Sequence, residues 1–181
     1  MKQHSKSKHD PCSKCGSNAR IVRGDYRFLE SGLDNVVLRD IELVRCEGCD
    51  FEEPIIRGLD EVLRTITLAL VSKPYRLAGE EIRYLRKYVE MSPDQFSRLL
   101  HIDRTTLSKW ENNDDPVGAQ SDLAIRMLVM SLDAELINKL SSVVREQFEN
   151  IHFELRKSKE GKFVPERPTI QVETPETFSF A

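Results

Sequence analysis

Four cysteines are the residues whose spacing predicts chemistry most directly. They stand in two CxxC pairs, Cys12 with Cys15 and Cys46 with Cys49. Each CxxC turn aims two sulfurs at one point, and the four thiolates of two such turns form the tetrahedral ligand set of structural zinc. Because four cysteine ligands leave no coordination position for a reacting water, we expect one structural Zn²⁺ per chain. A group of reduced core cysteines or a redox dithiol is the alternative interpretation.

A second set of polar residues lies on a short predicted helix, Asp103–Asn112. Leu107 and Trp110 are three residues apart on it and point inward together. The opposite face carries four hydrogen-bond donors: Arg104, Thr105, Ser108 and Lys109. A donor-bearing helix presented by a small helical core is the geometry of helix-turn-helix DNA recognition.

The elements that position this helix are also predicted from apolar spacing. A helix that begins at Ser92 and Pro93 combines a favourable N-cap with a proline at the first helical position. The apolar faces are expected to comprise Phe96, Leu99 and Leu100 on this helix, Ile82, Leu85 and Val89 on the one before it, and Leu123, Met127, Leu128 and Met130 on a helix over 121–132. The Met-containing face of the last helix has two interpretations, a contact between two copies of the chain or core packing.

The cysteine pairs flank a segment with strand-forming composition. Ala19–Glu30 and Val36–Arg45 are rich in β-branched and aromatic residues, and turn residues (Ser31, Gly32, Asp34, Asn35) separate them. We therefore expect a small antiparallel sheet with the cysteine turns at one end, which Pro54 terminates. A linker helix is expected over 58–72, a further helix over 134–150, and an extended tail over 163–181 that adds as a strand to a partner.

Composition restricts the function classes. The formal net charge of −3 gives no general attraction to nucleic acid, so DNA contacts must come from a local patch. No apolar run approaches the roughly 18 residues that span a bilayer, and the polar N-terminus lacks an apolar h-region. We expect a cytoplasmic protein without membrane association. No local pattern of acids, serines or histidines indicates catalysis, so we do not expect an enzyme.

These elements predict an α+β fold with five parts. A flexible arm (1–11) precedes a β-rich zinc-ribbon-like module (12–57) and a linker helix (58–75). An all-α helix-turn-helix domain (76–132) follows, and then a C-terminal helix and extended tail (133–181). A homodimer is expected because helix-turn-helix proteins usually read two half-sites.

The order of these parts resembles a known family. The CxxCG…CxxC ribbon, the linker helix and the block EIRYLRKYVEMSPDQFSRLLHIDRTTLSKWEN are similar to the MqsA-type antitoxins, also described as YgiT-type zinc-finger and helix-turn-helix regulators of the Xre class. The resemblance covers roughly residues 12–130 and is strongest in the cysteine pairs and in the block Leu107–Glu111.

The resemblance implies roles for individual residues. Zinc would be held by Cys12, Cys15, Cys46 and Cys49. Base contacts would come from Thr105 and Lys109, with Arg104, Thr106 and Ser108 as neighbours on the same helix. In this family the zinc domain binds a toxin, often an mRNA-cleaving ribonuclease, and the C-terminal domain dimerises and represses its own operon.

The chain departs from the family pattern at three places. Relatives often have glycine at the position of His101. They often have glutamine at the position of Pro93, and proline has no N–H that could donate to phosphate. Gln95 is the substitute for that glutamine. After the recognition helix, Asp114 and Asp115 stand where relatives often have basic residues. These two acids would weaken contacts with phosphate.

The helix-turn-helix pattern predicts a repressor that binds a palindromic double-stranded operator, and the resemblance implies that this repressor is the antitoxin of a type II toxin-antitoxin pair. The alternatives are a standalone zinc-finger regulator, or a protein-interaction adaptor without a toxin.

Overall fold

Two long strands form the N-terminal half of the computed structural model, which describes residues 11–136 and 169–173. β1 (Ala19–Arg27) pairs antiparallel with β2 (Val36–Cys46), and Ala19 lies opposite Cys46. The predicted antiparallel pair is confirmed. A short 3-10 helix, η1 (Leu29–Ser31), takes the last residues of the first predicted strand, and Gly32 follows it at a φ of +81° that favours glycine.

A third strand extends this sheet where the sequence predicted its end. β3 (Glu52–Ile55) pairs antiparallel with β2 and places Pro54 opposite Leu43, so the expectation that Pro54 terminates the sheet is wrong. β3 is bonded to β2 alone in the strand order β1-β2-β3. Proline is tolerated in such an edge strand because its missing N–H removes no bond from a second neighbour.

Five helices follow the sheet in the described part of the chain: α1 (Leu59–Ser72), α2 (Gly79–Tyr88), α3 (Pro93–Leu99), α4 (Arg104–Glu111) and α5 (Ala119–Leu132). Each helix whose bounds were predicted begins and ends within about two residues of the prediction. The capping signals account for this agreement. Ser92 caps α3 and accepts a hydrogen bond from the backbone N–H of Gln95, and Lys73 ends α1 immediately before Pro74.

The predicted apolar faces are only partly correct. Leu99, Leu123 and Met127 are 50%, 57% and 58% exposed, so they do not belong to the core. The core side of α5 is instead the stripe Asp122, Ile125, Arg126 and Val129, at helical spacing. The apolar pattern missed this face because two of its four buried residues are charged.

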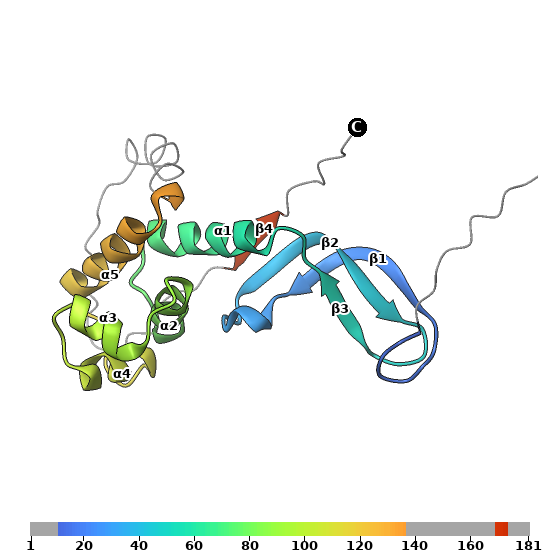
Figure 1. Cartoon of the computed structure of the whole chain (residues 1–181), viewed down its shortest axis with the longest axis horizontal. Coiled ribbons are helices and arrows are strands. Elements are labelled where there is room, and N and C mark those ends of the chain that lie inside the picture. Colours follow the sequence, from blue (N-terminus) through green and yellow to red (C-terminus); the bar gives the residue numbers. More distant parts are fainter. Residues whose placement is uncertain (1–10, 137–168, 174–181) are drawn as a thin grey trace, which may run out of the picture.

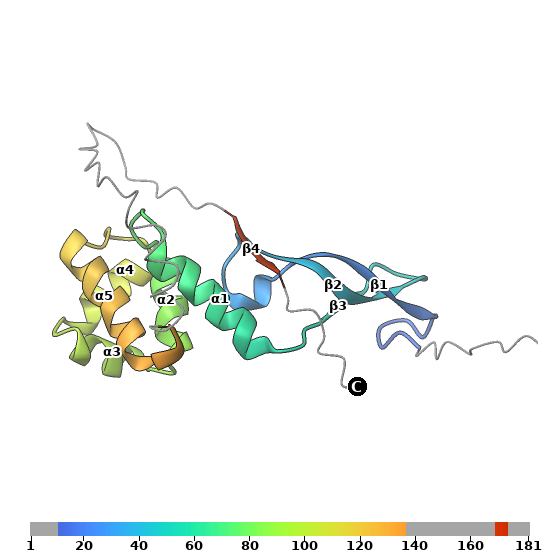
Figure 2. The same cartoon turned by 90° about the horizontal axis from the view of Figure 1, so that it is seen from above.

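One apolar core joins the sheet to the helices. It includes Leu38 and Leu43 of β2, Ile66 of α1, Leu107 of α4 and Ile125 of α5. The molecule is elongated, with α1 leading from β3 into the helical end (Figures 1 and 2). The cysteine loops lie at the far end of the sheet, so the two candidate sites occupy opposite ends of the molecule (Figure 1).

A C-terminal strand returns to this junction. β4 (Ile170–Glu173) pairs parallel with the first half of β2 and lies beside α1 (Figure 2). The described part of the predicted extended tail, residues 169–173, thus joins the chain's own sheet, because its apolar residues cover β2. The rest of that tail, 163–168 and 174–181, lies outside the described residues. The arm over 1–10 and nearly all of the helix predicted over 134–150 lie outside the described residues. Among the helices that the structure describes, none has the length and apolar character to cross a membrane.

Candidate metal centre and candidate nucleic-acid interface

The two cysteine loops share one local structure. The N–H of Cys12 donates to the carbonyl of Ser17 (2.8 Å), and the N–H of Cys46 donates to the carbonyl of Phe51 (3.0 Å). Both partners stand five residues later in the chain. Backbone N–H groups two residues beyond each first cysteine then approach its sulfur, at 3.4 Å from Lys14 to Cys12 and 3.2 Å from Gly48 to Cys46. N–H···S bonds of this kind stabilise thiolates.

The β1–β2 register brings the two loops face to face. Because Ala19 lies opposite Cys46, the loop before β1 and the loop after β2 meet at the same end of the sheet. They meet closely: a Cβ on Gly48 would lie 2.3 Å from the Ser17 hydroxyl oxygen, so a larger residue at position 48 would push the loops apart.

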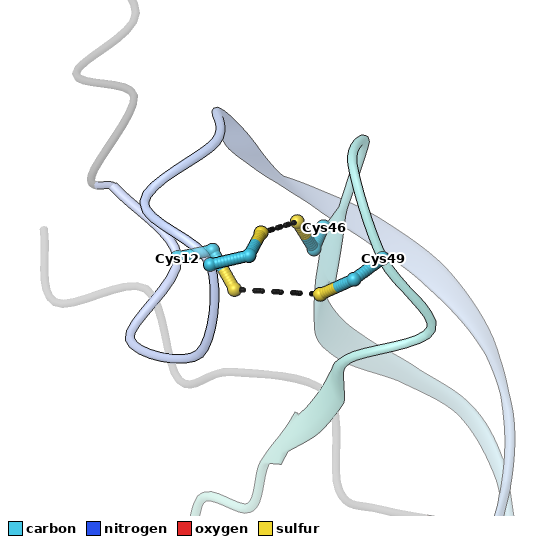
Figure 3. Close-up of side chains that lie close together, drawn as sticks. Cys12, Cys46 and Cys49 are labelled. Atoms are coloured by element: carbon cyan, nitrogen blue, oxygen red, sulfur yellow. Dashed lines mark hydrogen bonds between the residues drawn. The ribbon is translucent and has the colours of Figure 1, made fainter.

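The four sulfurs form one cluster. All lie within 4.8 Å of one another, with 3.9 Å between the sulfurs of Cys12 and Cys49 and 3.4 Å between those of Cys15 and Cys46 (Figure 3). Disulfides would require about 2.05 Å, and the cysteines are free. A tetrahedral ion with metal–sulfur bonds of about 2.3 Å sets its sulfurs about 3.8 Å apart. The cluster therefore fits one metal ion with four thiolate ligands.

The surroundings of the cluster shift two thiol pKa values in opposite directions and offer little other stabilisation. A backbone hydrogen bond with Phe51 lowers the pKa of Cys49, but hydrogen bonds with the other three thiols and burial outweigh it and raise that pKa to about 12. Hydrogen bonds from Ser17 lower the pKa of Cys15 to about 6, which favours its metal-binding form near neutral pH. Among the described residues, the apolar cluster at this end comprises Cys12, Ala19 and Cys46, with Val44, Cys49 and Phe51 packed against them. So small a cluster cannot hold the loops by burial alone, and metal ligation is the strongest interaction available to them.

At the other end of the molecule, α3 and α4 meet through a tight turn. The turn contains His101 at a φ of +53°, and the N–H of Ile102 donates to the carbonyl of Ser97. Asp103 is the N-cap residue of α4. Asn113 ends the segment after α4 at a φ of +59°, a conformation that asparagine tolerates.

α4 has one buried face and one exposed face. Leu107, Trp110 and Glu111 are buried against the other helices. The side chains predicted to contact DNA lie on the other side, where Arg104, Thr105, Ser108 and Lys109 are exposed and Thr106 is half-buried. Arg98, Thr106 and the turn that contains His101 line a shallow depression beside the start of α4.

Two of the predicted basic contacts are paired with acids of this chain. Arg104 lies 3.2 Å from a carboxylate oxygen of Asp94, and Lys109 lies 3.4 Å from one of Asp115. All four side chains are more than half exposed, so each pair is weak and can exchange for a phosphate. The pairs nonetheless reduce the local positive charge.

Gln95 has a structural role that the sequence interpretation did not include. Its side-chain oxygen accepts from the N–H of Ser92 at 2.9 Å, and its own N–H donates to the Ser92 hydroxyl, which completes a capping box on α3. This bond orients the Gln95 side chain at the N-terminus of α3. The pattern Ser-x-x-Gln was visible in the sequence and is the signal that identifies it.

Two buried charge networks escaped the sequence interpretation. Arg86 donates to both carboxylate oxygens of Glu111, at 2.7 and 3.0 Å, and joins α2 to α4. Arg126 pairs with Asp122 and donates to the carbonyls of Leu70, Val71 and Lys73 at the end of α1. Arg86 and Glu111 are 25 residues apart, and no local pattern connects them; Asp122 and Arg126 have the spacing of a helical ion pair.

Comparison with known proteins adds no family to this description. The chain matches no protein-family model, no curated protein and no solved structure. Its function must therefore be inferred from the four-cysteine cluster and from the helices around α4.

Proposed function

We propose that the chain is a sequence-specific DNA-binding transcriptional repressor in which α3 and α4 form a helix-turn-helix unit. The observation that carries this proposal is the division of α4 into a buried face and a face of exposed donors. A recognition helix needs this division, because the core must fix its position while its polar side chains reach the base edges.

The residues of α4 divide between base and phosphate contacts. Lys109 or Arg104 donates to guanine O6 and N7, and Thr105 and Thr106 contact a thymine methyl group or a phosphate. Ser108 lies on the same exposed face. The side chain of Gln95, held at the N-terminus of α3 by its bond to Ser92, is placed for a phosphate contact that fixes register.

Two copies of the chain would read a palindromic operator, with their α4 helices in successive major grooves about 34–36 Å apart. Exposed apolar residues on α5 support the dimer. Leu123 and Met127 are one helical turn apart and both more than half exposed, as a self-complementary helix contact requires. Replacement of both by aspartate is expected to yield a folded monomer with weak operator binding, measured by light scattering and gel shift.

The four-cysteine cluster holds one structural Zn²⁺ in this proposal, and the sheet that it stabilises is a protein-docking module. A repressor with such a module fits the antitoxin of a type II toxin-antitoxin pair, which binds its toxin and autoregulates its operon. The order of parts along the chain supports this role. A standalone zinc-finger regulator would have the same DNA-binding end and a different docking partner.

DNA binding is tested with the duplex upstream of the chain's own gene, excess competitor DNA and physiological salt. The intact chain is expected to shift this duplex specifically. Thr105→Ala/Lys109→Ala is expected to lose at least tenfold in affinity, because each direct base contact is worth about 1–3 kcal/mol. A double variant at two exposed positions around the start of α1, Arg57→Ala/Asp60→Ala, serves as the control. Equal binding by both variants would exclude α4 as the recognition helix.

Zinc binding is tested with Cys46→Ser and, as control, Ser13→Ala, which changes an exposed residue of the other cysteine loop. Elemental analysis is expected to find one zinc per intact or control chain and none in Cys46→Ser. Amide exchange should then show that residues 12–50 lose protection while α2–α5 keep theirs. A metal-loaded, protected sheet in Cys46→Ser would contradict the four-ligand assignment.

A protein-interaction adaptor is the second candidate. The observation that favours it is the pairing of Arg104 with Asp94 and of Lys109 with Asp115, which neutralises two of the donors that face DNA. Salt-dependent binding to any operator-like duplex would exclude this candidate.

A further inference from the structure

The second edge of β2 is divided between two different strands. β3 pairs with residues 42–45 and β4 pairs with residues 36–39, so together they cover the edge that β1 leaves free. β3 follows β2 after a short loop and belongs to the same continuous sheet. β4 comes from more than 120 residues later in the sequence.

β4 covers a part of β2 that requires a partner. Val36 and Leu38 have no exposed surface, and they lie opposite Ile170 and Val172 in the parallel register. The N–H of Ile170 donates to the carbonyl of Asn35 at 2.8 Å. Without a strand here, β2 would present a row of unpaired backbone groups beside exposed apolar side chains, which is a template for another strand.

The attachment of β4 is limited. The strand has four residues, its pairing is the less stable parallel kind, and Val172 is its one fully buried side chain among those described. On the side of the helices its packing is incomplete. A cavity of about 260 Å³ lies between β4 and the ends of α1 and α2, lined by Gln171, Lys73 and Glu81 among others.

A buried ion pair lines this cavity. The ammonium of Lys73 lies 2.5 Å from a carboxylate oxygen of Glu81, and that oxygen also accepts from the N–H of Ala78. Both charged side chains are more than nine-tenths buried. Lys73, Glu81 and the N–H of Ala78 are one another's partners. In the described part of the chain, β4 contributes no ion pair to this group.

We propose that the β2 edge at residues 36–39 is a strand-binding site for a partner protein and that β4 occupies it in cis as an exchangeable, autoinhibitory strand. The occupant in trans is an extended segment that runs parallel to β2 and carries β-branched apolar residues at alternate positions, as Ile170 and Val172 do. This site lies on the sheet and is independent of the DNA contacts of α4.

The specificity of the site follows from the register. Side chains at the positions of Ile170 and Val172 enter the core beside Val36 and Leu38, so these two positions accept only apolar residues. The positions of Thr169 and Gln171 are exposed and accept polar residues. A partner segment would therefore alternate apolar and polar residues over at least four positions.

The test uses a fluorescent peptide with the sequence of residues 167–175, RPTIQVETP, and three full-length chains. Ile170→Asp/Val172→Asp releases β4 because it places two charges in the core. Thr169→Asp/Gln171→Asp adds the same charge on the exposed face and is the matched control. Fluorescence anisotropy without DNA then measures peptide binding to each chain, so a negative result leaves the DNA-binding proposal unaffected.

The released variant is expected to bind the peptide saturably. The wild-type and control chains should bind it at least tenfold more weakly, because β4 competes at the millimolar effective concentration of a tethered segment. A peptide with aspartate at both apolar positions should bind to none of the chains. No peptide binding to a folded released variant, or equal binding to all three chains, would overturn the proposal.

Amide exchange on the wild-type chain provides a second measurement if the released variant fails to fold. Within residues 36–39, backbone amides alternate between facing β4 and facing β1. The amides that face β4 are expected to exchange at least tenfold faster than those that face β1, because β4 opens locally. Equal exchange rates on both sides would show that β4 leaves only when the whole sheet unfolds, and the site would not be exchangeable.

Discussion

Glu111 joins α4 to α2 through a buried ion pair. Its carboxylate accepts two hydrogen bonds from Arg86, and Arg86 also donates to the carbonyl of Met91. Both side chains are about nine-tenths buried. A buried pair of this kind is costly to break, because the remaining charge stays out of water without a partner.

Glu111→Ala is therefore expected to lower the free energy of unfolding by about 3–5 kcal/mol. The control Asp94→Ala breaks the exposed pair with Arg104 and is expected to change stability by less than about 1 kcal/mol. Urea denaturation followed by circular dichroism measures both. Similar losses in the two variants would mean that the Arg86–Glu111 pair does not hold α4 in place.

The pairing of Lys109 with Asp115 yields a prediction about DNA affinity. Asp115→Asn removes the competing carboxylate and frees the Lys109 ammonium for DNA. Under the proposed function, operator affinity should rise severalfold and the slope of log affinity against log salt should steepen by about one. Asp60→Asn makes the same charge change on α1, away from α4. An unchanged slope in Asp115→Asn would place Lys109 outside the interface.

At the scale of elements, the close approach of α2 to α4 determines where the donor face points. Gly79, the first residue of α2, lies against the end of α4, and its N–H donates to the side chain of Asn113 at 2.8 Å. A Cβ at this position would lie 2.4 Å from the carbonyl oxygen of Trp110. Only glycine permits this contact between the two backbones.

Gly79→Ala is expected to destabilise the chain by about 1–3 kcal/mol, because backbone atoms must move apart. Gly118→Ala is the matched control: Gly118 has ordinary backbone geometry, and a Cβ there meets nothing within 4 Å. Thermal denaturation compares the two variants. Equal melting temperatures would show that α2 and α4 tolerate a wider separation than the structure has.

The sequence predicted elements better than it predicted their contacts. Capping residues such as Ser92 and the turn residues around Gly32 act within a few positions, so helix and strand bounds could be predicted closely. The two CxxC pairs are also local patterns, so the cluster of four cysteines could be predicted as well. The orientation of α5 could not be predicted, because its buried stripe contains Asp122 and Arg126, whose partners lie on α1 and in the segment that follows it.

At the scale of the whole molecule, the core depends on contacts between distant segments. β4 pairs with a strand far from it in the sequence, and Tyr84 of α2 donates to the carbonyl of Leu63 in α1. No short-range pattern specifies such pairs. β3 was not predicted from the sequence, because a proline such as Pro54 normally terminates a strand. The contact with Leu63 buries Tyr84 at the junction between α1 and α2.

Three tyrosines, of which Tyr84 is buried and Tyr26 and Tyr88 are half-buried, predict a loss of stability in alkali. Burial raises the pKa of Tyr26 and Tyr88 to about 12 and raises that of Tyr84 still further above its usual value of 10. The folded chain then keeps protons that the unfolded chain releases, so stability is full below about pH 10 and falls as the pH rises towards 12. Melting temperatures at pH 8, 10 and 11 measure this fall, and Tyr88→Phe should make it shallower. A flat profile would contradict the burial of these hydroxyls.

The most direct test of the central claim is selection of DNA from a randomised duplex library by the zinc-loaded, full-length chain at physiological salt. The account predicts enrichment of a palindrome whose half-sites are about 10–10.5 base pairs apart, and loss of enrichment in Thr105→Ala/Lys109→Ala. Failure of the folded, metal-loaded chain to enrich any sequence would contradict the assignment of α4 as a recognition helix and would favour the adaptor.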